Sequence, residues 1–178
     1  KKLVEKMNGE IDVVSEEGKG TTFTINLPLK INPDAVEEET SEKEEQELSI
    51  AGLHILLVED NELNMEIAEF LLEDEGAVLT KAWNGQEAVD IFKNSPDGTF
   101  DVILMDIMMP VMDGLTATRT IRGLMREEAE RIPIIAMTAN AFEEDRKRSM
   151  EAGMNGHVAK PLDMQEIFKT IVDCIQHK

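Results

Sequence analysis

The sequence contains a single cysteine, Cys174, among its 178 residues. One cysteine excludes a disulfide within the chain and any metal site built from several thiolates. No uninterrupted apolar run approaches the roughly 20 residues of a membrane-spanning helix, and no secretory signal peptide opens the chain. We therefore expect a cytoplasmic location and no membrane contact through this segment, whether or not a longer parent chain is anchored in a membrane upstream.

Basic residues are also scarce, because 18 Lys and Arg face 37 Asp and Glu, which gives a formal net charge of −19. Nucleic acids and anionic membranes are bound through basic faces, so this excess argues against both as partners. The apolar content of 42% and the charged content of 31% are typical of a globular protein with a strongly ionised surface. Wherever carboxylates gather, a cation has to balance them.

Three regions differ in composition. Residues 1–31 show a short helical pattern and then two alternating stretches around a Gly18-Lys19-Gly20 turn, which predicts a helix and a β-hairpin. Residues 32–50 are rich in glutamate and poor in apolar residues, as in a solvated linker. Residues 51–178 carry enough apolar residues for a core.

The third region alternates strand and helix patterns. Apolar runs predict strands at 54–58, 78–82, 101–105, 133–137 and 156–159, and helical periodicity fills 61–75, 85–94, 115–128, 142–152 and 163–176. Five such units with short connections predict an α/β fold with a parallel sheet covered by helices on both faces. We expect the flavodoxin-like, doubly wound strand order 2-1-3-4-5.

Polar residues follow the predicted strands directly. Glu59 and Asp60 follow the first strand, Asp106 the third, Thr138 the fourth and Lys160 the fifth. Open α/β sheets bind ligands at the carboxyl ends of their strands, where the strand order reverses. The three carboxylates should therefore meet at one edge, with a hydroxyl and an ammonium beside them.

Three adjacent carboxylates favour a cation between them. A set of oxygen ligands that leaves room for water favours Mg²⁺. A carboxylate beside Mg²⁺, a lysine and a threonine suits capture of a phosphoryl group, with Asp106 as the nucleophile. Lys160 and Thr138 would stabilise the charge on the phosphoryl oxygens.

Residues 53–176 resemble the receiver domain of two-component response regulators. The resemblance rests on five motifs in order: Leu57-Val58-Glu59-Asp60-Asn61, Leu104-Met105-Asp106-Ile107-Met108-Met109-Pro110, Met112-Asp113-Gly114, Met137-Thr138-Ala139 and Lys160-Pro161. It implies that Asp106 accepts a phosphoryl group from a phosphohistidine, and that Glu59, Asp60, Asp106 and the Met108 main-chain oxygen hold Mg²⁺. It also implies that Thr138 is the switch hydroxyl, that Lys160 pairs with the phosphoryl group and that Lys160-Pro161 is a cis peptide. His157 is the candidate switch residue with Thr138, although it departs from the pattern, because many receivers have an aromatic residue at this position.

Lys1–Leu29 resembles the last helix and hairpin of the ATP-binding domain of sensor histidine kinases. The nucleotide-binding motifs of that family are not in this sequence, so the chain itself is expected to work as a phosphotransfer receiver rather than as a kinase. The order of the regions is that of a hybrid histidine kinase, a phosphotransferase. The resemblance thus implies two partners, the phosphohistidine domain of the kinase and a histidine phosphotransfer domain.

The first helix of the receiver region carries Ala68, Leu71 and Leu72 at core spacing and a second apolar stripe of Leu63, Ile67 and Phe70. The second stripe is either a docking surface for a histidine phosphotransfer domain or part of a broad core face.

Three other functions remain as alternatives: a pseudo-receiver that only binds partners, a Mg²⁺-dependent phosphatase with an aspartate nucleophile, and a flavin-binding protein. The five polar residues at the strand ends disfavour the first. Phosphatases of the haloacid-dehalogenase type carry a second Asp where this chain has Met108, and the acidic residues after the first strand would repel a flavin phosphate.

Overall fold

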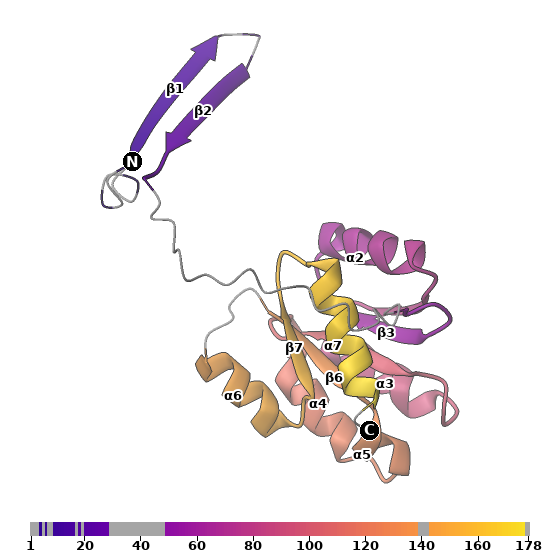
Figure 1. Ribbon diagram of the computed structural model, residues 1–178. Helices are drawn as coiled ribbons and strands as arrows, with labels where there is room; N and C mark the ends of the chain where they lie inside the picture. The colour runs from indigo at the N-terminus through magenta and orange to yellow at the C-terminus, as the bar shows by residue number, and fades with distance from the viewer. Residues whose placement is uncertain are drawn as a thin grey trace, which may run out of the picture. The chain divides into compact units, whose positions relative to one another are not determined.

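The computed structural model describes residues 4, 6, 9–16, 18, 20–28, 49–138 and 143–176 (Figure 1). The chain divides into two compact units, residues 1–45 and 46–178. The predicted linker, residues 32–50, lies outside the described residues except for Ser49 and Ile50. Of the short helix predicted near the start of residues 1–31, only Val4 and Lys6 are described, and both are helical.

The first unit contains the predicted hairpin. Strands β1 (Glu10–Glu16) and β2 (Gly20–Asn26) pair antiparallel. The turn contains Gly18 and Gly20 at φ of 78° and 103°, a backbone region that glycine adopts without a steric cost. The register places Val13 opposite Phe23 on one face, and both side chains are exposed.

The second unit contains a five-stranded parallel sheet in the order β4-β3-β5-β6-β7 (Figure 1). Its strands are β3 (His54–Val58), β4 (Val78–Ala82), β5 (Val102–Asp106), β6 (Ile134–Thr138) and β7 (Gly156–Ala159). This is the predicted 2-1-3-4-5 order, so the α/β fold class and topology are confirmed. The order reverses between β3 and β5, because the chain continues from β3 outward to β4 and then returns to the far side of β3.

The helices are α2 (Glu62–Asp74), α3 (Gly85–Asn94), α4 (Gly114–Arg122), α5 (Glu127–Arg131), α6 (Glu143–Ala152) and α7 (Met164–Gln176). The prediction of a single helix over 115–128 is wrong, because this segment contains two helices, α4 and the start of α5. Gly123 ends α4, its N–H donating to the carbonyl oxygens of Arg119 and Ile121. Among the described residues, no helix combines the length and apolar character that crossing a bilayer requires.

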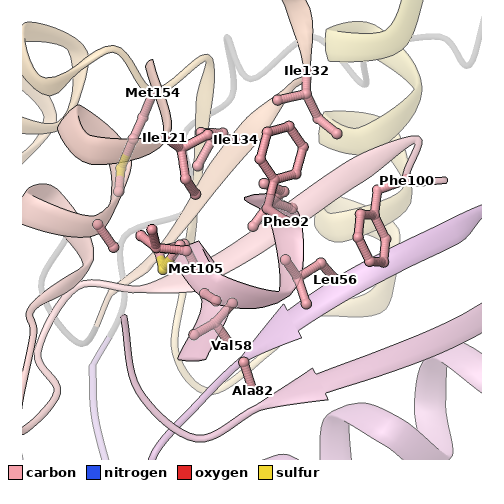
Figure 2. Packing of buried hydrophobic residues seen from close by; sticks show 14 of the residues in the cluster. Leu56, Val58, Ala82, Phe92, Phe100, Met105, Ile121, Ile132, Ile134 and Met154 are labelled. Carbon is pink, nitrogen blue, oxygen red and sulfur yellow. The ribbon is translucent and has the colours of Figure 1, made fainter. Parts of the chain in front are cut away.

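The core occupies both faces of the sheet, because successive strand residues point to opposite sides. On one face, Leu56, Ile103 and Ile134 pack with residues of α3, α4 and α5, and Figure 2 shows Leu56, Val58 and Met105 of the sheet beside Phe92 and Ile121 of the helices. On the other face, Leu57 and Leu104 pack with residues of α2 and α7. The strands are thus held rigidly, and the residues at their ends are fixed in place.

Candidate functional site

The three predicted carboxylates meet at the carboxyl edge of the sheet. Glu59 and Asp60 follow β3, and Asp106 is the last residue of the neighbouring β5. One carboxylate oxygen from each lies within 4.8 Å of the other two, while Glu59 and Asp106 are buried and Asp60 is exposed. A group of oxygen ligands that opens to solvent on one side is suited to a hard, partly hydrated cation such as Mg²⁺.

The Asp106 carboxylate is fixed by contacts to both of its oxygens. Oδ1 accepts a hydrogen bond from the Met108 main-chain N–H at 3.1 Å, and Oδ2 accepts one from Lys160 Nζ at 2.7 Å. The first contact places the backbone of Met108 beside the carboxylate, while the Met108 side chain is 79% exposed. The Met108 side chain is therefore not a core residue.

Gly114 allows the start of α4 to approach Asp106. A Cβ atom at Gly114 would lie 2.1 Å from the Asp106 main-chain oxygen, and the Gly114 N–H donates to the Ile107 carbonyl oxygen at 3.0 Å. Any side chain at this position would displace the end of β5. The sequence motif contains Gly114, but only the structure shows which contact requires it.

Lys160 provides the positive charge at this edge. Its ammonium donates to Oδ2 of Asp106 and to Oε2 of Glu59. Burial acts to lower the pKa of Lys160, but the hydrogen bonds and negative charges of Asp106 and Glu59 outweigh it and raise that pKa above its ordinary value of 10.5. The ammonium is therefore charged at neutral pH and balances two buried carboxylates.

Thr138 ends β6 and is buried, next to Ala159 of β7 in the sheet register. Its carbonyl oxygen accepts a hydrogen bond from the Lys160 main-chain N–H at 2.8 Å, which ties the ends of the two strands together. The peptide bond between Lys160 and Pro161 is cis, as the resemblance implied. The structure thus places Glu59, Asp60, Asp106, Thr138 and Lys160 at one edge of the sheet.

Asn64 is a contact of this site that sequence reasoning missed. Its side-chain Nδ2 donates to Oε1 of Glu59 at 2.9 Å. Asn64 lies in the first turn of α2, where its main-chain N–H donates to Oδ1 of the N-cap residue Asn61 at 3.1 Å. The only sequence signal was a second asparagine three residues after the helix cap.

The family model of the response regulator receiver domain matches the sequence of residues 55–172. The chain belongs to the response regulator receiver domain family.

Individual relatives agree with this family. The aerobic respiration control sensor protein ArcB of Escherichia coli K12 is 36% identical over 172 residues, which cover 96% of this chain and 21% of ArcB. This chain therefore spans about a fifth of the length of that curated relative.

Two solved structures carry receiver domains of the same fold. The receiver domain of the sensor histidine kinase PA1611 from Pseudomonas aeruginosa, with magnesium coordinated in its active site cleft, is 41% identical with a TM-score of 0.63. The match covers 71% of this chain and 99% of the PA1611 chain. The second is the receiver domain of Ssk1 from Saccharomyces cerevisiae, crystallised with the histidine phosphotransfer protein Ypd1. It is 31% identical with a TM-score of 0.62, and the match covers 71% of this chain and 92% of that chain.

His157 lies on β7 of the receiver, three residues before Lys160. It is half-buried and lines a hollow with Arg146 of α6 and Glu166 of α7. Glu59, Asp60 and Asp106 do not line this hollow. Burial and the charge of Arg146 lower the pKa of His157, and Glu166 opposes them. The lowered pKa favours the neutral form of the ring at pH 7.

The second apolar stripe on α2 of the receiver is exposed. Leu63, Ile67 and Phe70 are 63%, 46% and 68% exposed, whereas Ala68 and Leu72 on the same helix are buried. The interpretation as part of a broad core face is therefore wrong. A small hollow beside this stripe is lined by Asn64, Ile67, Pro161 and Leu162 and reaches Glu59 and Lys160.

Proposed function

We propose that Asp106 is the phosphoacceptor of this receiver domain and takes a phosphoryl group from a phosphohistidine. The observation that carries the proposal is the position of its carboxylate. It belongs to the acidic group, which consists of Glu59, Asp60 and Asp106, and it lies 2.7 Å from the Lys160 ammonium. In this step a carboxylate oxygen of Asp106 forms a bond to phosphorus, the phosphorus–nitrogen bond to the imidazole breaks, and an acyl phosphate remains. A further transfer to the histidine of a phosphotransfer domain reverses the same exchange.

Lys160 and Thr138 stabilise the transferred group in this proposal. The ammonium of Lys160 already lies against Asp106 and would stay within reach of an oxygen of the phosphoryl group, and the Thr138 hydroxyl would donate to another. His157, on the strand that leads to Lys160, would respond as the switch residue together with Thr138. The assignment of Thr138 rests on the receiver motif and on its position at the end of β6, and that of His157 on its position three residues before Lys160.

The acidic group fits Mg²⁺, because all of its ligand atoms are carboxylate oxygens and they lie within 4.8 Å of one another. Glu59, Asp60, Asp106 and the main-chain oxygen of Met108 would hold the ion. When bound, the ion would neutralise negative charge on the phosphoryl oxygens. The receiver of PA1611, which carries magnesium in its cleft, supports this assignment.

The parent protein in this proposal is a hybrid histidine kinase. Residues 1–31 would be the C-terminal part of its ATP-binding domain, residues 32–50 an acidic linker and residues 51–178 the receiver. The match to ArcB supports this order, because it covers 96% of the chain and thus includes residues before the receiver. The donor would then be the phosphohistidine of the same parent chain, and the location cytoplasmic.

The decisive test is phosphoryl uptake from acetyl phosphate with Mg²⁺, followed by intact mass. We expect a gain of one phosphoryl group on the wild-type protein, no gain without Mg²⁺ and no gain on Asp106→Asn. Asp90→Asn is the matched control, because Asp90 lies on the exposed side of α3, where its Oδ2 accepts a hydrogen bond from Gln86 of the same helix. A gain on Asp106→Asn equal to that of the wild type would assign the acceptor elsewhere.

The exposed stripe of Leu63, Ile67 and Phe70 is the proposed docking surface for a histidine phosphotransfer domain. It lies on α2, whose first turn also contacts Glu59, so a partner on this surface would stand beside the acidic group. The complex of Ypd1 with the Ssk1 receiver shows that another receiver of this fold binds such a protein. Apolar side chains of this exposure are typical of protein interfaces.

Phe70→Asp should slow phosphoryl transfer to a histidine phosphotransfer protein by about tenfold or more, because a charge replaces an aromatic contact. Uptake from acetyl phosphate should not change, because Phe70 is exposed on α2 and has no contact with Asp106. Met125→Asp is the control, since Met125 is an exposed apolar residue that lies between α4 and α5. Equal transfer rates for Phe70→Asp and Met125→Asp would exclude the stripe as the docking surface.

A further inference from the structure

We propose that Asn64 is a positioning residue that holds Glu59 in the orientation needed to bind Mg²⁺. This inference rests on the proposed function of the acidic group. It assigns a role to a side chain that does not itself reach the ion and that lies on a different element from the carboxylates.

Glu59 is the most buried carboxylate of the group, at 2% exposure. A buried carboxylate needs hydrogen-bond donors for both oxygens, and it has two: Lys160 Nζ at Oε2 and Asn64 Nδ2 at Oε1, the latter at 2.9 Å. The two donors come from two different elements, because Lys160 follows β7 and Asn64 lies in α2. Together they leave the Glu59 side chain a single orientation.

Asn64 can act as a fixed donor because its own position is fixed twice. It belongs to the first turn of α2, and its main-chain N–H donates to the side chain of Asn61, the residue that caps this helix. Asparagine is less favourable than leucine in a helix, so the residue gives the helix itself no advantage at this position. Its amide contributes through Glu59 instead.

A side chain that orients a metal-binding carboxylate typically changes the metal affinity by about 10- to 100-fold when it is replaced. Without the Asn64 amide, Oε1 of Glu59 would lose its donor and the side chain would have several rotamers available. Binding of the ion would then have to select one of them, which weakens the affinity. The negative charge of the site would remain the same, so the ion would still bind.

The test is a calorimetric titration with Mg²⁺ alone. Asn64→Leu, which keeps the size of the side chain and removes the donor, should bind Mg²⁺ about 10- to 100-fold more weakly than the wild type. Asn94→Leu is the matched control, because Asn94 is exposed on α3 and its side chain donates to the Asp90 carbonyl oxygen of the same helix. Asn64→Ala serves as a second variant, with the fold of each checked by circular dichroism.

A double-mutant cycle separates positioning from a general structural effect. If Asn64 acts through Glu59, then Asn64→Leu has no further effect on the Mg²⁺ affinity of a Glu59→Ala protein, which has no acceptor for the Asn64 amide. An unchanged affinity of Asn64→Leu and Asn64→Ala, or an equal loss in the Glu59→Ala background, would overturn the inference.

Phosphoryl uptake distinguishes this inference from the proposed function. At saturating Mg²⁺, Asn64→Leu should take up a phosphoryl group from acetyl phosphate at the wild-type rate, and only the Mg²⁺ concentration for half of that rate should rise. If the wild-type protein binds Mg²⁺ and is phosphorylated while Asn64→Leu matches it throughout, only the role of Asn64 fails. If the folded wild-type protein does neither, the proposed function fails and the role of Asn64 with it.

Discussion

Replacing Lys160 by methionine should lower the free energy of unfolding, measured without Mg²⁺, by about 3 kcal/mol. The lysine ammonium contacts Glu59 and Asp106, which are 2% and 7% exposed, and methionine would leave two neighbouring buried carboxylates without a cation. Removing one partner of a buried ion pair has a large cost because the remaining charge stays buried. The measurement is urea-induced unfolding followed by circular dichroism.

The same substitution should reduce the rate of phosphoryl uptake from acetyl phosphate by about a hundredfold or more, because a donor to the developing charge is lost. Added Mg²⁺ should stabilise Lys160→Met more than the wild type, since an ion at the acidic group would then be its main source of positive charge.

Lys81→Met is the matched control for stability. Lys81 pairs with Glu69 at 2.6 Å, but both side chains are about a third exposed, and such pairs contribute about 1 kcal/mol or less. If both lysine variants unfold at the same urea concentration, then hydration of the Glu59 and Asp106 carboxylates is sufficient, and the ammonium is not needed for stability.

The position of the site could be predicted from the sequence because it depends on backbone topology. Buried parallel strands appear as continuous apolar runs, so the residues after Val58, Met105 and Ala159 mark the carboxyl ends of their strands. Once the strand order follows from the alternation of strands and helices, these ends have to meet. That Lys160 lies near Asp106 was therefore predictable, although 54 residues separate them along the chain.

The side-chain contacts around the site could not be predicted in the same way. The hydrogen bond from Asn64 to Glu59 depends on how α2 begins, and the close approach of Gly114 to Asp106 depends on how α4 packs against the end of β5. Neither follows from hydrophobic periodicity. The break between α4 and α5 was missed because residues 115–128 keep a helical pattern through Gly123, and glycine within such a pattern only weakens a helix prediction.

Arg122 lies near that break and connects several elements far from the acidic group. Its guanidinium donates to three main-chain oxygens, those of Ala129 at 2.7 Å, Ile132 at 2.8 Å and Gly153 at 2.9 Å. It also donates to Oδ1 of Asn155 at 2.8 Å, an atom that accepts a second hydrogen bond from the N–H of Ile134 at the start of β6. Burial lowers the pKa of Arg122 below its ordinary value, and arginine nevertheless keeps its charge at neutral pH.

These contacts give Arg122 a role that another cation cannot fill. The carbonyl oxygens of Ile132 and Gly153 follow the C-terminal ends of α5 and α6, where helices leave acceptors without partners in the helix. A positive charge there is favourable, and a planar group with five donors can reach all four acceptors at once. A lysine ammonium is a single point and would satisfy only part of this set.

Arg122→Met should therefore lower the free energy of unfolding by about 3 kcal/mol, because several partly buried acceptors lose their donor together. Arg122→Lys should recover only part of that loss. Arg131→Met is the control, since Arg131 pairs with Glu127 at a site where the two side chains are 68% and 74% exposed, and we expect it to change stability by about 0.5 kcal/mol or less. Urea-induced unfolding measures all three variants.

Because Arg122 has no contact with the acidic group, phosphoryl uptake per folded molecule should stay at the wild-type level. Equal unfolding midpoints for Arg122→Met and Arg131→Met would mean that water replaces the guanidinium at these carbonyl oxygens.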